Sequence, residues 1–415
     1  MEAAVVDAGS KLLKAGLAVP DQAPSLIMPT QMKRMLEDGS SVDNSLLEDV
    51  TIDPVVRGCV KDWDAMEDLL HHVLYTGLEW EVGNEGQILF TEPLCTPKKI
   101  ANPFWPSSVF LYKEAAPEVG SNIHYEAVRE RLVQLLFETF NVSGFYASEQ
   151  AVLSLYAVGR ISGCTVDIGH GKIDIAAVLE GAVQHIASRR FEVGGIDLTK
   201  LLAQELGKSN PMVNLSLSDV EKLKEQFSCC AEDEVAYDRM LRSCETEEHT
   251  LPDGQSTENE ETPLDLICSL GSMVIRIGRE RFTVGEALFQ PSILGLEAHG
   301  IVEQLVRSIA TVSSENQKQL LENTVLCGGT TSMTVCFPAD NMFALLNAGF
   351  ESRFQKEASL CSSAIRPSLV KPPEYMPENL SVYSAWVGGA ILAKVVFPQN
   401  QHVTKADYDE TGPSV

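Results

Sequence analysis

A short turn built from aspartate and glycine occurs twice in this chain, and it constrains the fold more than any other feature. The first copy carries Asp7, Gly9 and Ser10, and the second carries Asp167, Gly169 and Gly171. Each copy lies between two apolar, β-branched stretches, a pattern typical of a strand, a tight turn and a returning strand. Glycine lets backbone N–H groups approach phosphate oxygens, and an aspartate can hold the water shell of Mg²⁺. Two such turns facing each other predict a site for a nucleotide triphosphate between two related domains.

A third glycine turn follows an apolar strand at residues 326–331 and contains Gly328 and Gly329. A flat glycine pair of this kind can lie against a base or a ribose. Taken alone, an Asp-x-Gly at the end of a strand is an ordinary turn in most proteins. Three glycine turns in strand contexts together favour one shared ligand.

The composition excludes some classes of function. The chain has 415 residues, of which 44% are hydrophobic, and a formal net charge of -26. That length and apolar content support several well-buried subdomains. Because no basic surplus exists to displace counterions, we expect no broad, sequence-independent binding to nucleic acid or to anionic membranes. We also expect no direct sequence-specific binding to nucleic acid. The N-terminal residues lack the pattern of a secretory signal, and no apolar run reaches transmembrane length.

The spacing of apolar residues predicts helices over residues 63–75, 124–140 and 149–158. These helices alternate with strands, which indicates an α/β protein of two lobes with a cleft between them. Residues 31–49 are polar and predict an exposed loop or a small subdomain. Residues 232–262 hold eleven acidic residues. They predict either a solvated insertion or a docking surface for a basic partner.

Five longer stretches resemble actin, and they occur in the same order as in actin. They are Phe137–Val142, Gln150–Arg160, Ala287–Ser292, Asn323–Thr331 and Tyr408–Ser414. The chain therefore resembles the actin superfamily, and within it the divergent actin-related proteins of plants. The resemblance implies an α/β, actin-like fold, shared with sugar kinases and heat-shock ATPases, in which two lobes form four subdomains around a nucleotide cleft.

The resemblance also implies where the four subdomains lie along the chain. Subdomain 1 would comprise residues 1–29, 54–157 and 383–415, and subdomain 2, shortened, residues 30–53. Subdomain 3 would comprise residues 158–193 and 289–382, and subdomain 4 residues 194–288, with the acidic insertion near 232–262.

By the same resemblance, the cleft would hold ATP or ADP with Mg²⁺. The residues implied for the nucleotide are Asp7, Gly9, Ser10 and Lys14 in the first turn, Asp167, Gly169 and Gly171 in the second, Gly195 on the opposite wall, Lys224 and Glu225 on a helix beside the adenosine, and Gly328, Gly329 and Thr330 in the glycine turn. Asp7 and Asp167 would hold the magnesium through water. Gln150 matches the glutamine that orients the attacking water, a catalytic role that applies only if hydrolysis is retained.

Four positions depart from the actin pattern. Lys11 replaces a glycine of the first turn, where its side chain either obstructs the phosphate or adds its own charge. His170 replaces an aspartate, Asp174 replaces a histidine that helps to place the water, and Val382 replaces a lysine of the pocket. Losing one group that positions the water can cost roughly 100-fold in rate. We therefore expect the ATPase activity to be weak or absent.

The resemblance implies a non-polymerising scaffold or regulatory subunit of a nuclear chromatin-remodelling complex, present also in the cytoplasm, with structurally bound ATP. The loop that joins subunits in actin filaments is shortened here, and added acidic residues would repel like copies. The implied partners are subunits of such a complex, among them an amphipathic helix of the motor subunit and another actin-related protein or actin. That helix would lie in a groove lined by Tyr156, Gly159, Leu392 and Val395, although these residues could instead be plain core.

Two alternative functions remain. One is an ATP-hydrolysing cytoskeletal actin relative. The other is a small-molecule kinase, which would need a carboxylate base beside a second substrate pocket.

Overall fold

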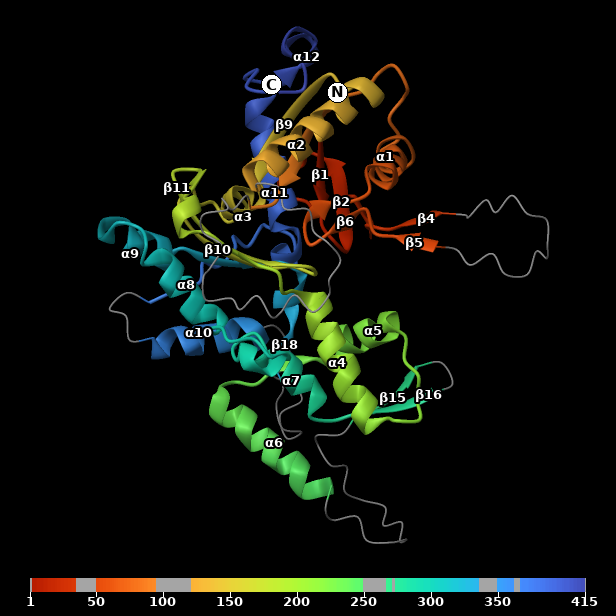
Figure 1. Cartoon of the computed structure of the whole chain (residues 1–415). Coiled ribbons are helices and arrows are strands. Elements are labelled where there is room, and N and C mark those ends of the chain that lie inside the picture. The colour runs from red at the N-terminus through yellow and green to blue at the C-terminus, as the bar shows by residue number, and fades with distance from the viewer. Residues whose placement is uncertain are drawn as a thin grey trace, which may run out of the picture.

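Two sheets organise the protein, and each is built around one of the two predicted hairpins (Figure 1). The computed structural model describes residues 2–34, 50–94, 121–248, 266–270, 273–335, 349–361 and 366–414. The first sheet has the strand order β19-β9-β8-β1-β2-β3. Its strands are β1 (Ala4–Ala8), β2 (Leu12–Leu17), β3 (Leu26–Pro29), β8 (Gln87–Glu92), β9 (Gly144–Glu149) and β19 (Val403–Thr404).

The second sheet repeats the arrangement of the first. Its order is β12-β11-β10-β17, and β13 also pairs with β11. The strands are β10 (Gly163–Ile168), β11 (Ile173–Leu179), β12 (Ala182–Val183), β13 (Arg189–Phe191) and β17 (Thr324–Cys327). In both sheets an antiparallel hairpin lies next to a parallel strand: β8 runs beside β1, and β17 runs beside β10. The repeated turn predicted from the sequence is therefore a repeated hairpin.

Two helices fill the space between the sheets. They are α3 (Gln150–Ala157) and α11 (Leu380–Val396), and both are largely apolar. One hydrophobic cluster joins them to Val5 and Leu89 of the first sheet and to Ala176 of the second. A Cβ added to Gly388 would lie 1.8 Å from the carbonyl oxygen of Leu153, so the two helices approach at a point that only glycine permits.

The outer face of the first sheet is covered by the other helices of its lobe. α1 (Trp63–His71) continues into a π-helical turn (His72–Gly77), and α2 (Ser121–Gln134) continues into another (Leu135–Thr139). With α3, these segments confirm the three helices predicted from the sequence. The last helix, α12 (Lys405–Thr411), also belongs to this lobe, so both ends of the chain lie in it (Figure 1). Two small antiparallel pairs complete this part of the chain: β4 (Met32–Arg34) pairs with β5 (Val50–Ile52), and β6 (Val55–Val56) pairs with β7 (Cys59–Val60).

The second lobe has the largest hydrophobic cluster of the described residues. Its helices are α4 (Gly195–Ser209), α5 (Leu217–Phe227), α7 (Glu280–Glu286), α8 (Ile301–Ile309), α9 (Ser314–Glu322) and α10 (Gly349–Leu360), with 3₁₀ turns at His185–Ala187, Pro291–Leu294 and Gly329–Ser332. Two small sheets complete it: β14 (Cys229–Cys230) pairs with β18 (Thr334–Val335), and β15 (Leu266–Leu270) pairs with β16 (Met273–Ile277).

The acidic segment is less uniform than the sequence suggested. Its first half forms α6 (Glu234–Glu248), and Tyr237 of this helix is buried against Phe282. The helix is therefore anchored on one face, and residues 249–262 lie outside the described residues. Most of the predicted polar loop, residues 35–49, also lies outside them. Across the described part of the chain, no helix is long and apolar enough to cross a membrane.

Candidate functional site

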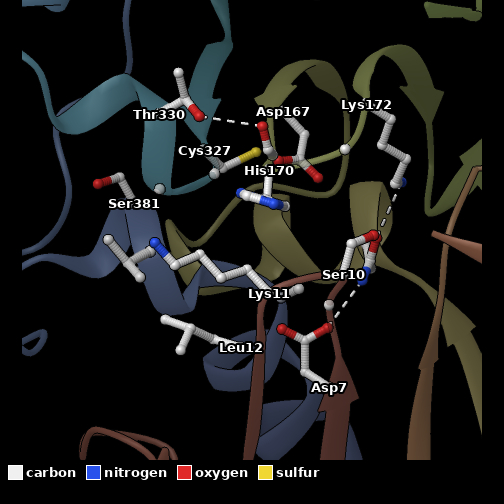
Figure 2. Close-up of a pocket in the computed structure, with 18 of the residues that line it drawn as sticks. Asp7, Ser10, Lys11, Leu12, Asp167, His170, Lys172, Cys327, Thr330 and Ser381 are labelled. Carbon is white, nitrogen blue, oxygen red and sulfur yellow. Dashed lines mark hydrogen bonds between the residues drawn. The ribbon is translucent and has the colours of Figure 1, made fainter. Parts of the chain in front are cut away.

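The turns of the two hairpins face a cavity of about 390 Å³ (Figure 2). Residues of both lobes line it, and they come from the β1–β2 turn, the β10–β11 turn, α5 and the glycine turn after β17. Of the residues implied for the nucleotide, the lining includes Asp7, Gly9, Ser10, Lys14, Gln150, Asp167, Gly169, Gly171, Lys224, Glu225, Gly328, Gly329 and Thr330. Val382 lines it as well. The structure thus brings together the sites that the sequence placed far apart.

Asp7 lies at the base of the first turn and accepts three hydrogen bonds. Lys14 Nζ donates to Oδ2 at 2.9 Å, Thr91 Oγ1 donates to Oδ1 at 2.5 Å, and Gln150 Nε2 donates to Oδ1 at 2.8 Å. Burial alone would raise the pKa of this carboxyl, but Lys14 and the two hydrogen bonds lower it. Asp7 is therefore a charged carboxylate whose acceptor sites are largely taken by the protein.

Glycines of the second turn and of the glycine turn after β17 each permit a close approach. A Cβ on Gly171 would lie 2.9 Å from Cα of Arg57, across the cavity. A Cβ on Gly328, whose φ is +90°, would lie 2.4 Å from Oδ1 of Asp167. Burial raises the pKa of Asp167, which weakens the preference of this carboxyl for its charged form. The carboxyl and the glycine turn are thus in direct contact.

Asp174 is buried and does not face a space in which a catalytic water could be held. It is buried between two cations: Lys172 Nζ pairs with it, and Arg190 donates to it through Nε at 2.8 Å and Nη2 at 3.0 Å. Burial opposes ionisation, but Lys172 and Arg190 lower the pKa of the carboxyl. Lys172 Nζ also lies 3.5 Å from Oε1 of Gln150. In Figure 2 the dashed lines run from Lys172 through this amide to Asp7.

Lys224 fixes the wall of the cavity on the side of α5. Its Nζ donates to the carbonyl of Gly195 and to Thr199 Oγ1, both at 2.8 Å. Burial lowers the pKa of Lys224 to about 8. Gly195 itself is behind this wall and is not part of the lining; a Cβ there would lie 2.9 Å from Thr330 Oγ1. Gly195 therefore acts through the close packing of its backbone against neighbours that line the cavity.

Side chains of the two lobes also contact each other across the cavity. Lys11 pairs with Glu225 and, at 2.9 Å, with Glu221 on α5. His170 Nδ1 lies 3.2 Å from the same Glu221 carboxylate. Although burial works against it, the hydrogen bonds from His170 and Lys11 lower the pKa of Glu221 to about 2. The lysine that replaces a glycine of the first turn thus bridges the cavity.

A second bridge joins the lobes at the rim. Arg57 donates to both carboxylate oxygens of Asp197 at 3.0 and 3.1 Å, and to the carbonyl of Gly171 at 2.9 Å. Because such a fork makes parallel charge-assisted bonds, it fixes orientation as well as distance. Next to it, the backbone N–H of Gly58 donates to Ser10 Oγ at 2.8 Å. Ser10 is therefore already engaged by the protein.

Sequence reasoning missed four residues of this site: Lys172, Arg190, Glu221 and Arg57. A signal existed for Lys172, because a lysine directly after the second turn mirrors the lysines of the first. Glu221 lies one helical turn before Glu225 and thus on the same helix face, which also could have been noticed. Arg57 and Arg190 carry no local signal, since their partners lie 140 and 16 residues away.

The predicted partner groove lies at the ends of α3 and α11. Tyr156 and Leu392 are half-buried and pack against the cluster between the sheets. Gly159 and Val395 are exposed, Val395 by 44%, and nothing lies within 4 Å of a Cβ added to Gly159. Two of the four residues thus pack against the core and two lie at the surface, and the partner groove stays a prediction.

Comparison with known proteins gives the class of the molecule. The family model described as Actin matches residues 1–103 and 119–415. The chain belongs to the actin family.

Within that family the chain is an actin-related protein. It is 69% identical over 418 residues to actin-related protein 7 of Arabidopsis thaliana, and 62% identical over 415 residues to actin-related protein 7 of Oryza sativa subsp. japonica. Each alignment covers 100% of this chain and 98% of the relative. It is 27% identical over 433 residues to centractin of Saccharomyces cerevisiae, covering 99% of this chain and 95% of centractin. The resemblance to actin-related proteins of plants, and the actin-like fold, are confirmed.

Proposed function

We propose that this protein is a non-polymerising, actin-related scaffold or regulatory subunit of a nuclear chromatin-remodelling complex, and that it holds ATP or ADP as a structural ligand. The observation that carries the structural role of the nucleotide is the state of Gln150. Its Nε2 donates to Asp7 at 2.8 Å, and its Oε1 faces Lys172 Nζ at 3.5 Å. An amide held by two neighbours is not free to turn toward a water and align it for attack on phosphorus, and hydrolysis requires that alignment.

The second position that would place this water supports the same conclusion. Asp174 is buried and paired with Lys172 and Arg190. A carboxylate fixed by two cations has no free acceptor directed to the cavity. The turns and the glycine pair still provide a cradle for a nucleotide, so binding is supported more strongly than cleavage.

The role as a scaffold is supported by the surface at the ends of α3 and α11. Val395 is exposed by 44%, and it adjoins Leu392, which is only half-buried. An amphipathic helix of a motor subunit could bury this apolar strip, as helices do in grooves of other proteins. Further partners of the proposed complex would be another actin-related protein or actin. The protein would work in the nucleus and also be present in the cytoplasm.

Affinity purification from nuclear extract tests the proposal, with two surface variants as a matched pair. The wild-type protein should retain subunits of a remodelling complex in stoichiometric amounts. Val395→Asp should lose the motor subunit, because burying an unpaired carboxylate is costly. Val235→Asp on α6, at a valine exposed by 66%, is the control and should retain it. Recovery of filament-type partners alone, or sedimenting filaments in salt that polymerises actin, would contradict the proposal.

An ATP-hydrolysing cytoskeletal actin relative is the second candidate. It is favoured by the fact that both Asp-Gly turns and Gln150 line one cavity. This function requires that the purified protein release phosphate from ATP above background. If no phosphate is released, this candidate function is excluded.

A further inference from the structure

Lysine side chains gather on the phosphate side of the cavity. Lys11, Lys14 and Lys172 all line it, together with the imidazole of His170. We propose that the cavity binds the phosphates of ATP or ADP without a divalent metal, with the ammonium group of Lys172 supplying the charge that Mg²⁺ would supply. This inference rests on the proposed binding of a nucleotide and concerns how the same site neutralises phosphate.

Lys172 is placed and charged for this role. It follows the second turn directly, is 7% exposed, and lines the cavity with its ammonium group beside Gln150. Its partner Asp174 is shared with Arg190, which already makes two hydrogen bonds to that carboxylate. Asp174 is thus shared by two cations. An ammonium group has three N–H donors, so Lys172 can direct one of them to a phosphate, and charge-assisted hydrogen bonds to phosphate are strong in such buried surroundings.

The carboxylates that would hold a hydrated Mg²⁺ fit that ion poorly. Oxygen ligands or their bound waters need acceptor sites on the protein. Asp7 already accepts from Lys14, Thr91 and Gln150. Asp167 lies directly against the glycine turn, where a Cβ on Gly328 would be 2.4 Å from its Oδ1. His170 stands where the sequence resemblance implies a third carboxylate. The magnesium predicted between Asp7 and Asp167 therefore does not match the donor set of this cavity.

Two further side chains can join Lys172 once phosphate is present. Lys11 and His170 both contact Glu221 in the structure. A phosphate group entering between the turns competes with this one carboxylate for both side chains. Lys14 lies at the base, paired with Asp7 at 2.9 Å. The phosphates would thus be surrounded by protein cations, and an added divalent ion would have to displace existing ion pairs.

Calorimetric titration of the nucleotide-free, full-length protein with ATP and with ADP tests the inference. Each titration is carried out once with excess EDTA and once with MgCl₂. The dissociation constant should change by less than about threefold between the two buffers. Lys172→Met keeps the apolar stem and leaves Asp174 paired with Arg190. It should weaken binding in EDTA by about tenfold or more and make binding depend on magnesium. Lys318→Met, at an exposed lysine of α9, is the control and should bind as the wild type does.

The outcomes distinguish failure of this inference from failure of the proposed nucleotide binding. No binding in either buffer would overturn the proposed nucleotide site itself. Wild-type binding that is more than about tenfold weaker in EDTA would overturn metal-independent binding and leave the nucleotide site standing. Unchanged affinity of a folded Lys172→Met variant would also overturn the assigned role. If that variant does not fold, the dissociation constants of the wild-type protein in EDTA and in MgCl₂ still test whether binding is independent of the metal.

Discussion

Lys11 in the turn of the first hairpin is paired with Glu225 on α5, so an ion pair of the protein itself bridges the cavity between the two lobes. The same lysine contacts Glu221 at 2.9 Å. Both side chains of the Lys11–Glu225 pair retain some exposure, so the pair contributes less to stability than a buried one would. Its position matters more, because it joins the two lobes across the cavity in which we propose that the nucleotide binds.

Removing the bridge should loosen the closed arrangement of the lobes. Lys11→Ala should increase amide hydrogen exchange in α5 and in the β1–β2 turn, while the hydrophobic cores keep their protection. Lys222→Ala is the control, because Lys222 is on the same helix and its ion pair with Asp219, at 3.2 Å, lies within α5. Equal exchange in α5 for both variants would show that Lys11 does not hold the lobes.

Lys224 predicts an unusual dependence of stability on pH. Burial lowers its pKa from 10.5 to about 8 in the folded protein, while the unfolded chain keeps the ordinary value. Between these two values the unfolded state binds more protons, so this lysine makes the unfolding free energy rise with pH. Relative to Lys224→Met, the wild type should gain about 1–3 kcal/mol over that range in urea denaturation. A constant or falling difference would contradict the burial of a titrating amine.

Substituting alanine for glycine should have opposite effects on stability at a crowded position and at an open one. Gly388→Ala would place a Cβ 1.8 Å from the Leu153 carbonyl oxygen, so the helices must separate, at a cost of about 1–3 kcal/mol or more. Gly207→Ala in α4 meets nothing within 4 Å and should stabilise the protein by up to about 1 kcal/mol. Thermal unfolding of the two variants checks the pair. Similar stability of Gly388→Ala and wild type would mean that the contact is not closely packed.

A buried ion pair in the second lobe predicts a partial rescue. Arg353 donates to both oxygens of Glu286 at 2.8 and 2.7 Å, and both side chains are 1% exposed. Arg353→Met leaves an unpaired buried carboxylate and should cost about 3–5 kcal/mol. The double variant Glu286→Leu with Arg353→Met should lose much less, because no charge remains buried. Chemical denaturation of the two variants would refute this account if the double variant were the less stable one.

The sequence predicted the parts of the site that local patterns determine. A carboxylate and glycines between β-branched stretches specify each hairpin turn, and the helix of Gln150 followed from its apolar spacing. Contacts made by closure of the lobes could not be predicted in this way. Arg57 and Asp197 are 140 residues apart, and neither lies in a recognisable motif.

The acidic segment shows a different limit. Its many carboxylates indicated a solvated insertion, yet Tyr237 anchors α6 against Phe282. Tyr237, Met240 and Leu241 recur at helical spacing, but this periodicity is a weak signal in a segment with so many charged residues. Gly195 was predicted to contact the nucleotide but does not line the cavity. Its backbone packs behind Lys224 and Thr330, and a match of sequence motifs cannot distinguish such a supporting position from the lining itself.

The fate of bound ATP tests the central claim most directly. Protein loaded with ATP labelled on the γ-phosphate is freed of unbound nucleotide and incubated, first with EDTA and then with MgCl₂, and the nucleotide that remains bound is identified. Because Gln150 is held by Asp7 and Lys172, the account predicts that the label stays in bound ATP. Conversion of the bound ATP to ADP with release of labelled phosphate would contradict a structural role for the nucleotide.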